Sequence, residues 1–119
     1  MSAKIIDGKK VAEITMNRIR EDVDNWVSAG NRRPFLKVVQ VGTDPASTTY
    51  IGAKTRACKR VGIDTDTTHL PDTVSAKELK ATIRSFNEDD DIDGILVQLP
   101  LPAHLSSHDV IESIDHRKD

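Results

Sequence analysis

The stretch VGTDPASTTYIGAKTRACKRVGI, residues 41–63, decides how this chain is expected to fold. The apolar run Phe35–Val41 leads into it and predicts a buried strand. Asp44 followed by Pro45 is typical of a helix start, because an aspartate caps the first turn and a proline suits the first helical position. The sequence therefore predicts a strand, a turn and then a helix over about residues 46–60.

One lysine stands out on this helix. At about 100° per residue, one stripe of the helix carries an unusual set of side chains: Tyr50, Lys54, Ala57, Cys58 and Val61. We expect this stripe to face the apolar interior, where water no longer solvates the charge of Lys54. A lysine so placed is a candidate acid or base, whereas one that reaches solvent from the edge of the stripe is only a surface residue. Spacing alone leaves both interpretations open.

The rest of the chain alternates helices with strands. The patterns predict a turn at Asp7-Gly8, helices over 9–29, 74–87 and from Ser106, and strands over 63–70 and 92–99. The strand 63–70 is rich in threonine and is expected near a sheet edge, and the strand 92–99 is expected to be covered on both faces. Strands separated by helices pair in parallel through crossover connections. We therefore predict an α/β fold: one three-layer αβα domain over residues 1–119, built on a mainly parallel sheet.

Composition narrows the functional classes. The chain has 119 residues, of which 37% are hydrophobic and 30% charged, and its net charge is −2, so it suits a globular domain and gives nucleic-acid binding no electrostatic support. No run approaches the roughly 20 apolar residues of a membrane span. With no leader pattern at its start, the chain is expected in the cytoplasm, with the mitochondrion as the alternative. Cys58 is the single cysteine and the four histidines lack metal-ligand spacing, so no metal site is expected.

Two more polar side chains fall where ligands bind in parallel sheets, beyond the carboxyl ends of the strands. Tyr50 lies one turn before Lys54, and its phenol could stack on a flat ligand or serve as an ordinary core residue. Gln98 is the one polar side chain in residues 95–101. Its amide could hydrogen-bond Lys54 or a ligand, or it could satisfy nearby backbone groups. The sequence contains neither of the two common glycine-rich phosphate loops.

Two long motifs resemble one known family. VGTDPASTTYIGAKTRACKRVGI and DGILVQLPLP look like the two signature stretches of the bifunctional methylenetetrahydrofolate dehydrogenase/methenyltetrahydrofolate cyclohydrolase family, and the opening IIDGKKVA and the closing KD also fit. The resemblance covers essentially the whole chain. It implies an enzyme of one-carbon metabolism that interconverts 5,10-methylene-, 5,10-methenyl- and 10-formyltetrahydrofolate, by NAD(P)-dependent dehydrogenation and by hydrolysis of the methenyl bridge.

The resemblance also implies a set of site residues. Lys54 matches the family lysine that serves as acid and base in the hydrolysis. Gln98 matches the glutamine that hydrogen-bonds this lysine, and Tyr50 matches the tyrosine that stacks on the folate. These three are therefore expected to be catalytic, and Leu99 and Pro100 are expected to join them in binding the substrate.

Parts of the family pattern are missing from this chain. The family continues KD with V-D-G, whose aspartate binds the pterin, but the sequence ends at Asp119, and it has His116 where the family usually has proline. In the family, NAD or NADP is bound by a following Rossmann domain that the sequence lacks. We therefore interpret the chain as the N-terminal catalytic half. It is expected to bind folate, to be inactive alone as a dehydrogenase, and to be monomeric where the full-length family forms homodimers.

Two alternatives remain on the sequence alone. The chain could be a non-catalytic folate-binding or interaction module, or it could belong to a related two-domain dehydrogenase that acts on another substrate. The stretch VQLPLP argues against the second alternative, because we associate it only with the folate family.

Overall fold

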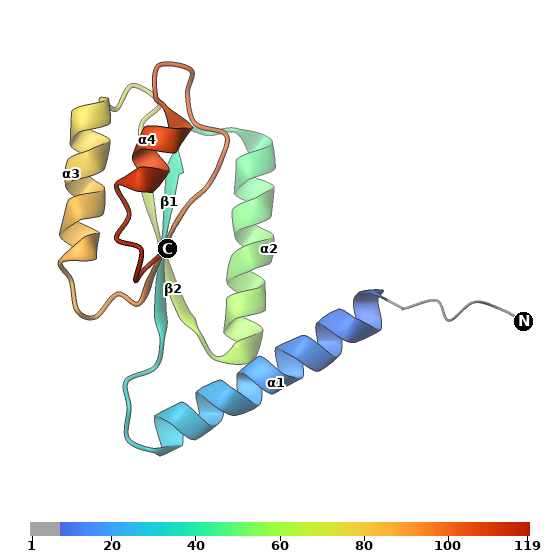
Figure 1. Cartoon of the computed structure of the whole chain (residues 1–119). Helices are drawn as coiled ribbons and strands as arrows, with labels where there is room; N and C mark the ends of the chain where they lie inside the picture. The colour runs from blue at the N-terminus through green and yellow to red at the C-terminus, as the bar shows by residue number, and fades with distance from the viewer. Residues whose placement is uncertain (1–7) are drawn as a thin grey trace, which may run out of the picture.

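The computed structural model describes residues 8–119, in which four helices alternate with three strands (Figure 1). In chain order they are α1 Gly8–Ser28, β1 Phe35–Val41, α2 Pro45–Val61, β2 Asp64–Leu70, α3 Ala76–Asn87, β3 Gly94–Val97 and α4 Ser107–Glu112. The order and type of the predicted elements agree with this. The turn predicted at Asp7-Gly8 begins outside the described residues.

The three strands form one parallel sheet in the order β2-β1-β3. Figure 1 shows α3 and α4 on one face of this sheet and α2 on the other, so the predicted three layers are present. β2 lies at an edge, as its threonine-rich sequence predicted. Because the strands all run the same way, the segments that follow β1 and β3 meet at one end of the sheet, the carboxyl end. The predicted α/β fold is confirmed.

The prediction for β3 was wrong in two respects. The strand is shorter than 92–99, and it is not covered on both faces, since Ile95 and Val97 are buried while the residues between and before them are half-buried. The cause is that α2 packs over β1 and β2, which leaves the α2 side of β3 partly open. Pairing with β1 ends at Gln98, whose N–H makes the last ladder bond, because Pro100 has no N–H to continue it.

The apolar core lies between the sheet and the pair α3 and α4. Leu79 and Ile83 of α3 are fully enclosed there, and a buried aliphatic side chain of this kind contributes about 1.5–3 kcal/mol. The α2 side of the sheet differs, because it holds the buried polar side chains of residues 8–119: Gln40, Ser47 and Gln98. One side therefore supplies most of the apolar burial, and the other supplies polar groups.

Local chemistry fixes both ends of α2. At its start, the Asp44 carboxylate accepts a hydrogen bond from the backbone N–H of Ser47 at 3.1 Å, as the sequence predicted. At its end, Gly62 adopts the left-handed conformation with φ 86°. A side chain is strained in this conformation, and a Cβ there would lie 3.2 Å from Cγ1 of Val23, so glycine is favoured. The helix that carries the candidate lysine thus begins and ends at defined residues.

The long helix α1 agrees with the helix predicted over 9–29, and Val23 is its single buried side chain. Trp26 is 53% exposed and Ile19 is 39% exposed. Figure 1 shows the reason, because α1 crosses the end of α2 and runs on away from the sheet. Within residues 8–119, no helix combines the length and the apolar character that crossing a membrane requires.

Arg32 and Asp93 join the starts of β1 and β3. The two terminal nitrogens of Arg32 donate to the carboxylate oxygens of Asp93 at 2.9 and 3.1 Å, and the backbone N–H of Phe35 donates to the same carboxylate at 2.9 Å. Burial disfavours the charged carboxylate, but the hydrogen bonds from Arg32 and Phe35 outweigh it and lower the pKa of Asp93. The turn before β1 is therefore tied to the sheet.

Asp93→Asn is expected to lower the melting temperature by about 3–6 °C at neutral pH, because the charge-assisted pair is lost while roughly half of the side chain is already in water. Since folding lowers the pKa of this carboxyl, its stabilising effect is present above the ordinary value of 3.8 and is lost as the pH falls through the lowered value. The melting temperatures of both proteins should therefore converge in strong acid, below the lowered pKa.

Asp91→Asn is the matched control for this prediction. The Asp91 carboxylate is 84% exposed and lies 3.7 Å from Nε of Arg32, so its loss should barely change the melting temperature. Equal losses from the two variants, or a gap that persists in strong acid, would show that the Asp93 pair does not stabilise the fold.

Candidate active site

A hydrogen bond between α2 and the segment after β3 forms the centre of the candidate site. Nζ of Lys54 donates to Oε1 of Gln98 at 2.9 Å, across 44 residues of sequence. Nε2 of the same amide donates to the Leu99 carbonyl at 2.9 Å. Gln98 is 7% exposed, so its amide is enclosed while both of its polar atoms have partners. The hydrogen bond foreseen between Lys54 and Gln98 is therefore present.

The predicted burial of Lys54 was wrong. Lys54 is exposed and Tyr50 is 55% exposed, whereas the buried residues of α2 are Ser47, Ile51 and Val61. In the first half of the helix, the buried face therefore contains Ser47 and Ile51 and not Tyr50. The inward-facing Ser47 hydroxyl has an acceptor, the Leu99 carbonyl, so this small polar residue can face the sheet while Tyr50 faces water. Lys54 lies at the border, where its ammonium reaches both solvent and Gln98.

Cys58 belongs to the predicted stripe and is half-buried. Burial raises the pKa of its thiol, which keeps the sulfur protonated at neutral pH. Cys58 is therefore suited to packing rather than to nucleophilic catalysis.

The remaining predicted site residues lie at the same end of the sheet. Tyr50 is one helical turn before Lys54, and Leu99, which is 40% exposed, directly follows Gln98. The Leu99–Pro100 peptide bond is cis. Pro100 lines a hollow of about 360 Å³ along the carboxyl end of the sheet, together with Val41, Gly42, Thr43, Asp44, Asp72, Leu101 and Pro102. Of the five predicted residues, Pro100 alone lines this hollow. Lys54, Gln98 and Leu99 are instead joined by the hydrogen bonds of the Gln98 amide, and the roles of all five stay predictions.

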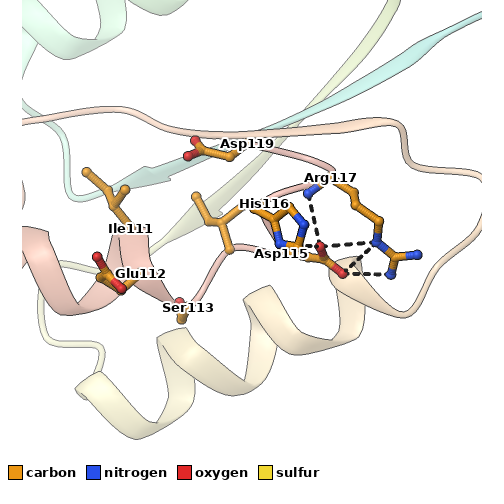
Figure 2. Close-up of a pocket in the computed structure, with 8 residues that line it drawn as sticks. Ile111, Glu112, Ser113, Asp115, His116, Arg117 and Asp119 are labelled. Atoms are coloured by element: carbon orange, nitrogen blue, oxygen red, sulfur yellow. Dashed lines mark hydrogen bonds and ion pairs between the residues drawn. The ribbon is translucent and has the colours of Figure 1, made fainter.

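A larger hollow of about 770 Å³ lies elsewhere (Figure 2). It is lined by a single stretch of chain within residues 111–119. Figure 2 shows one bonded charged pair beside it: Arg117 donates to the Asp115 carboxylate through its side chain and its backbone N–H. These bonds hold the pKa of Asp115 well below its usual range. Because its charged pair is already satisfied and no predicted residue lines it, this hollow is not the candidate site.

Two buried residues next to the site were missed by the sequence analysis. Gln40, at the end of β1, is 2% exposed, and its Nε2 donates to Oγ1 of Thr48 at 2.9 Å. Ser47 is also 2% exposed, and its hydroxyl donates to the Leu99 carbonyl at 3.3 Å. The signal for Gln40 was available, because it is a polar residue near the end of an apolar strand, as Gln98 is. Ser47 showed no comparable signal.

The comparisons with known proteins agree with the geometry. The sequence model of the family described as "Tetrahydrofolate dehydrogenase/cyclohydrolase, catalytic domain" matches residues 6–119. This chain belongs to that family. A curated relative, the bifunctional protein FolD of Methylobacillus flagellatus, is 46% identical over 119 residues, which are 100% of this chain and 41% of the relative.

Two solved structures have the same fold. A 5,10-methylenetetrahydrofolate dehydrogenase from the silkworm, Bombyx mori, is 40% identical with a TM-score of 0.95, over 99% of this chain and 41% of that one. The Trypanosoma brucei methylenetetrahydrofolate dehydrogenase-cyclohydrolase, solved with NADP cofactor and inhibitor, is 30% identical with a TM-score of 0.88, over 100% and 41%. The resemblance read from the two motifs is confirmed, and the chain spans about two fifths of the length of these relatives.

The start of α2 does not fit the phosphates of a dinucleotide cofactor. In parallel sheets, phosphates bind at the N-terminus of a helix that follows a strand, where free backbone N–H groups attract them. α2 follows the central strand β1, but its first residue, Pro45, has no N–H and its start is capped by the Asp44 carboxylate. A carboxylate at this position repels phosphate. Within residues 8–119, no group of three or more His, Cys, Asp or Glu side chains is placed to hold a metal ion.

Proposed function

We propose that this chain is the folate-binding catalytic part of a FolD enzyme, which interconverts 5,10-methylene-, 5,10-methenyl- and 10-formyltetrahydrofolate. One observation carries the proposal: the ammonium of Lys54 is held by the buried amide of Gln98 at the carboxyl end of the sheet. Family membership supplies the substrate class, and the pair supplies a group that can move protons. The roles of individual residues rest on the resemblance together with this geometry.

The hydrolysis needs a group that first takes a proton and then returns it. A water oxygen bonds to the methenyl carbon, and the neutral amine of Lys54 takes one proton from that water. The bond between the carbon and N5 of the pterin then breaks, and the Lys54 ammonium gives its proton to N5 while the second water proton leaves to solvent. The product is 10-formyltetrahydrofolate, and Gln98 keeps Nζ in place throughout.

Substrate binding falls to the exposed apolar groups around this pair. Tyr50 presents its ring to solvent one turn from Lys54, which suits stacking on a flat pterin or aminobenzoyl ring. Leu99 and Pro100 directly follow Gln98, are exposed and would contact the same ligand. Their exposure fits a surface that the substrate covers.

Hydride transfer is assigned to no residue of this chain. In that step, NAD(P)+ supplies the hydride acceptor for the methylene carbon. The start of α2 does not fit the cofactor's phosphates. We therefore propose that the cofactor binds to a part of the enzyme that corresponds to the residues of the FolD relative outside its matched 41%. The purified 119-residue chain is then expected not to reduce NAD(P)+ with methylenetetrahydrofolate.

A chimera tests the proposal directly. In it, this chain replaces the matching 41% of Methylobacillus flagellatus FolD, and both activities are assayed. We expect measurable dehydrogenase and cyclohydrolase rates, because the matched parts are 46% identical. A chimera that folds, as judged by circular dichroism and thermal melting, but has neither activity would overturn the proposed function. This protein is called the FolD chimera below.

A further inference from the structure

Two side chains of α2 reach the segment after β3. Lys54 donates to the Gln98 side chain at 2.9 Å, and Ser47 donates to the Leu99 carbonyl at 3.3 Å. Ser47 and Lys54 lie two helical turns apart, so they share one face of α2. Both bonds therefore run from that face to the same two consecutive residues.

The segment after β3 has few other anchors. The Gln98 N–H bonds to the Val39 carbonyl at 3.0 Å, and the next backbone-to-backbone bond donated along the described chain comes from Leu105. Pro100 and Pro102 have no N–H to donate. The Leu99 carbonyl is instead held by two side chains, Nε2 of Gln98 and the hydroxyl of Ser47. Since a carbonyl oxygen has two lone pairs, its capacity is filled.

This carbonyl decides which way the Gln98 amide points. The Leu99 oxygen can only accept a hydrogen bond, so it must face the NH₂ of the amide, and the amide oxygen then faces Lys54. The reversed amide would place oxygen against oxygen and NH₂ against the ammonium. If the Leu99 carbonyl were displaced, the Gln98 amide would favour this orientation less, and Oε1 would face Lys54 less often.

Ser47 is itself held firmly. It is 2% exposed, and its N–H donates to the Asp44 carboxylate at 3.1 Å. Its neighbour Thr48 accepts a bond from the fully enclosed Gln40 of β1, which ties this turn of α2 to the central strand. Hydroxyls on helices often bond to a carbonyl of their own helix, as Thr49 does with Pro45 at 3.0 Å. The Ser47 hydroxyl differs, because it reaches another element.

We propose that Ser47 is a positioning residue: its hydroxyl holds the Leu99 carbonyl, and through it the Gln98 amide, in the orientation that presents Oε1 to Lys54. The proposal rests on the proposed function, because this orientation matters for the reaction only if Lys54 moves protons. Ser47 acts through Gln98 and has no contact with the reacting atoms.

The test uses Ser47→Ala and Ser47→Cys in the FolD chimera. For Ser47→Ala, the kcat of methenyl hydrolysis should fall about three- to tenfold, the range that one net hydrogen bond supports. The KM for methenyltetrahydrofolate and the dehydrogenase rate should stay within about twofold, since Ser47 neither binds substrate nor takes part in hydride transfer. Ser47→Cys keeps the size of the side chain and donates weakly, so its kcat should lie between those of the other two proteins.

Thr49→Ala is the matched control, because it removes a hydroxyl from the same turn of α2 on its exposed side. It should leave both activities unchanged. If Ser47→Ala matched this control, or lowered both activities equally, the positioning role would be overturned while the proposed function stood. If the unmodified chimera had neither activity, both proposals would fall together.

Discussion

Lys54→Met in the FolD chimera is expected to lower the rate of methenyl hydrolysis by about 10²–10⁴-fold, the contribution typical of a positioned acid or base. Methionine preserves the length and apolar stem of the side chain but can neither take nor give a proton. The lysine is positioned for this work, since its Nζ lies 2.9 Å from Oε1 of Gln98. The dehydrogenase rate should fall far less, because hydride transfer requires no proton acceptor at this position. The ratio of the two rates is therefore the measurement.

Lys59→Met controls for the loss of a positive charge. Lys59 lies in the last turn of the same helix and is exposed, so both activities should survive its replacement. Cyclohydrolase activity near the wild-type rate in Lys54→Met would remove this lysine from the mechanism. Equal losses of both activities would instead make it a substrate-binding residue.

Local signals explain why the bounds of α2 were predicted closely. The capping carboxylate of Asp44 and the left-handed Gly62 each act within a few residues, so the sequence pattern contains them. The extent and covering of β3 depend on where α2 lies over the sheet, which no local pattern specifies. The same holds for α1, whose apolar spacing predicts a helix but not which element covers it.

The sequence likewise predicted which residues form the centre of the candidate site, but not how deeply they are buried. Lys54 and Gln98 were foreseen together because each is polar beside an apolar element at the carboxyl end of the sheet. The burial of Lys54 was predicted wrongly, since a helical stripe shows which side chains share a face and not which way that face turns. Ser47 was missed because its acceptor is the Leu99 carbonyl. Every residue has a backbone carbonyl, so the residue types do not indicate where such an acceptor lies.

Gln98→Glu in the FolD chimera is expected to lower the hydrolysis rate by about 100-fold, through two effects in the same direction. A glutamate carboxylate only accepts hydrogen bonds, so the donation to the Leu99 carbonyl becomes a contact between two oxygens. Its negative charge beside Lys54 also favours the ammonium, which cannot take a proton from the attacking water. The dehydrogenase rate should change much less, and both rates are measured on the same preparation.

Gln98→Leu separates these two effects. It removes the acceptor without adding charge, and we expect a loss of about tenfold. Urea unfolding of both variants tests whether the loss of a 7%-exposed amide has merely destabilised the fold. If the leucine variant lost as much hydrolysis as the glutamate variant at equal stability, the charge on Lys54 would not limit the reaction. Gln98 would then act only by keeping the lysine in place.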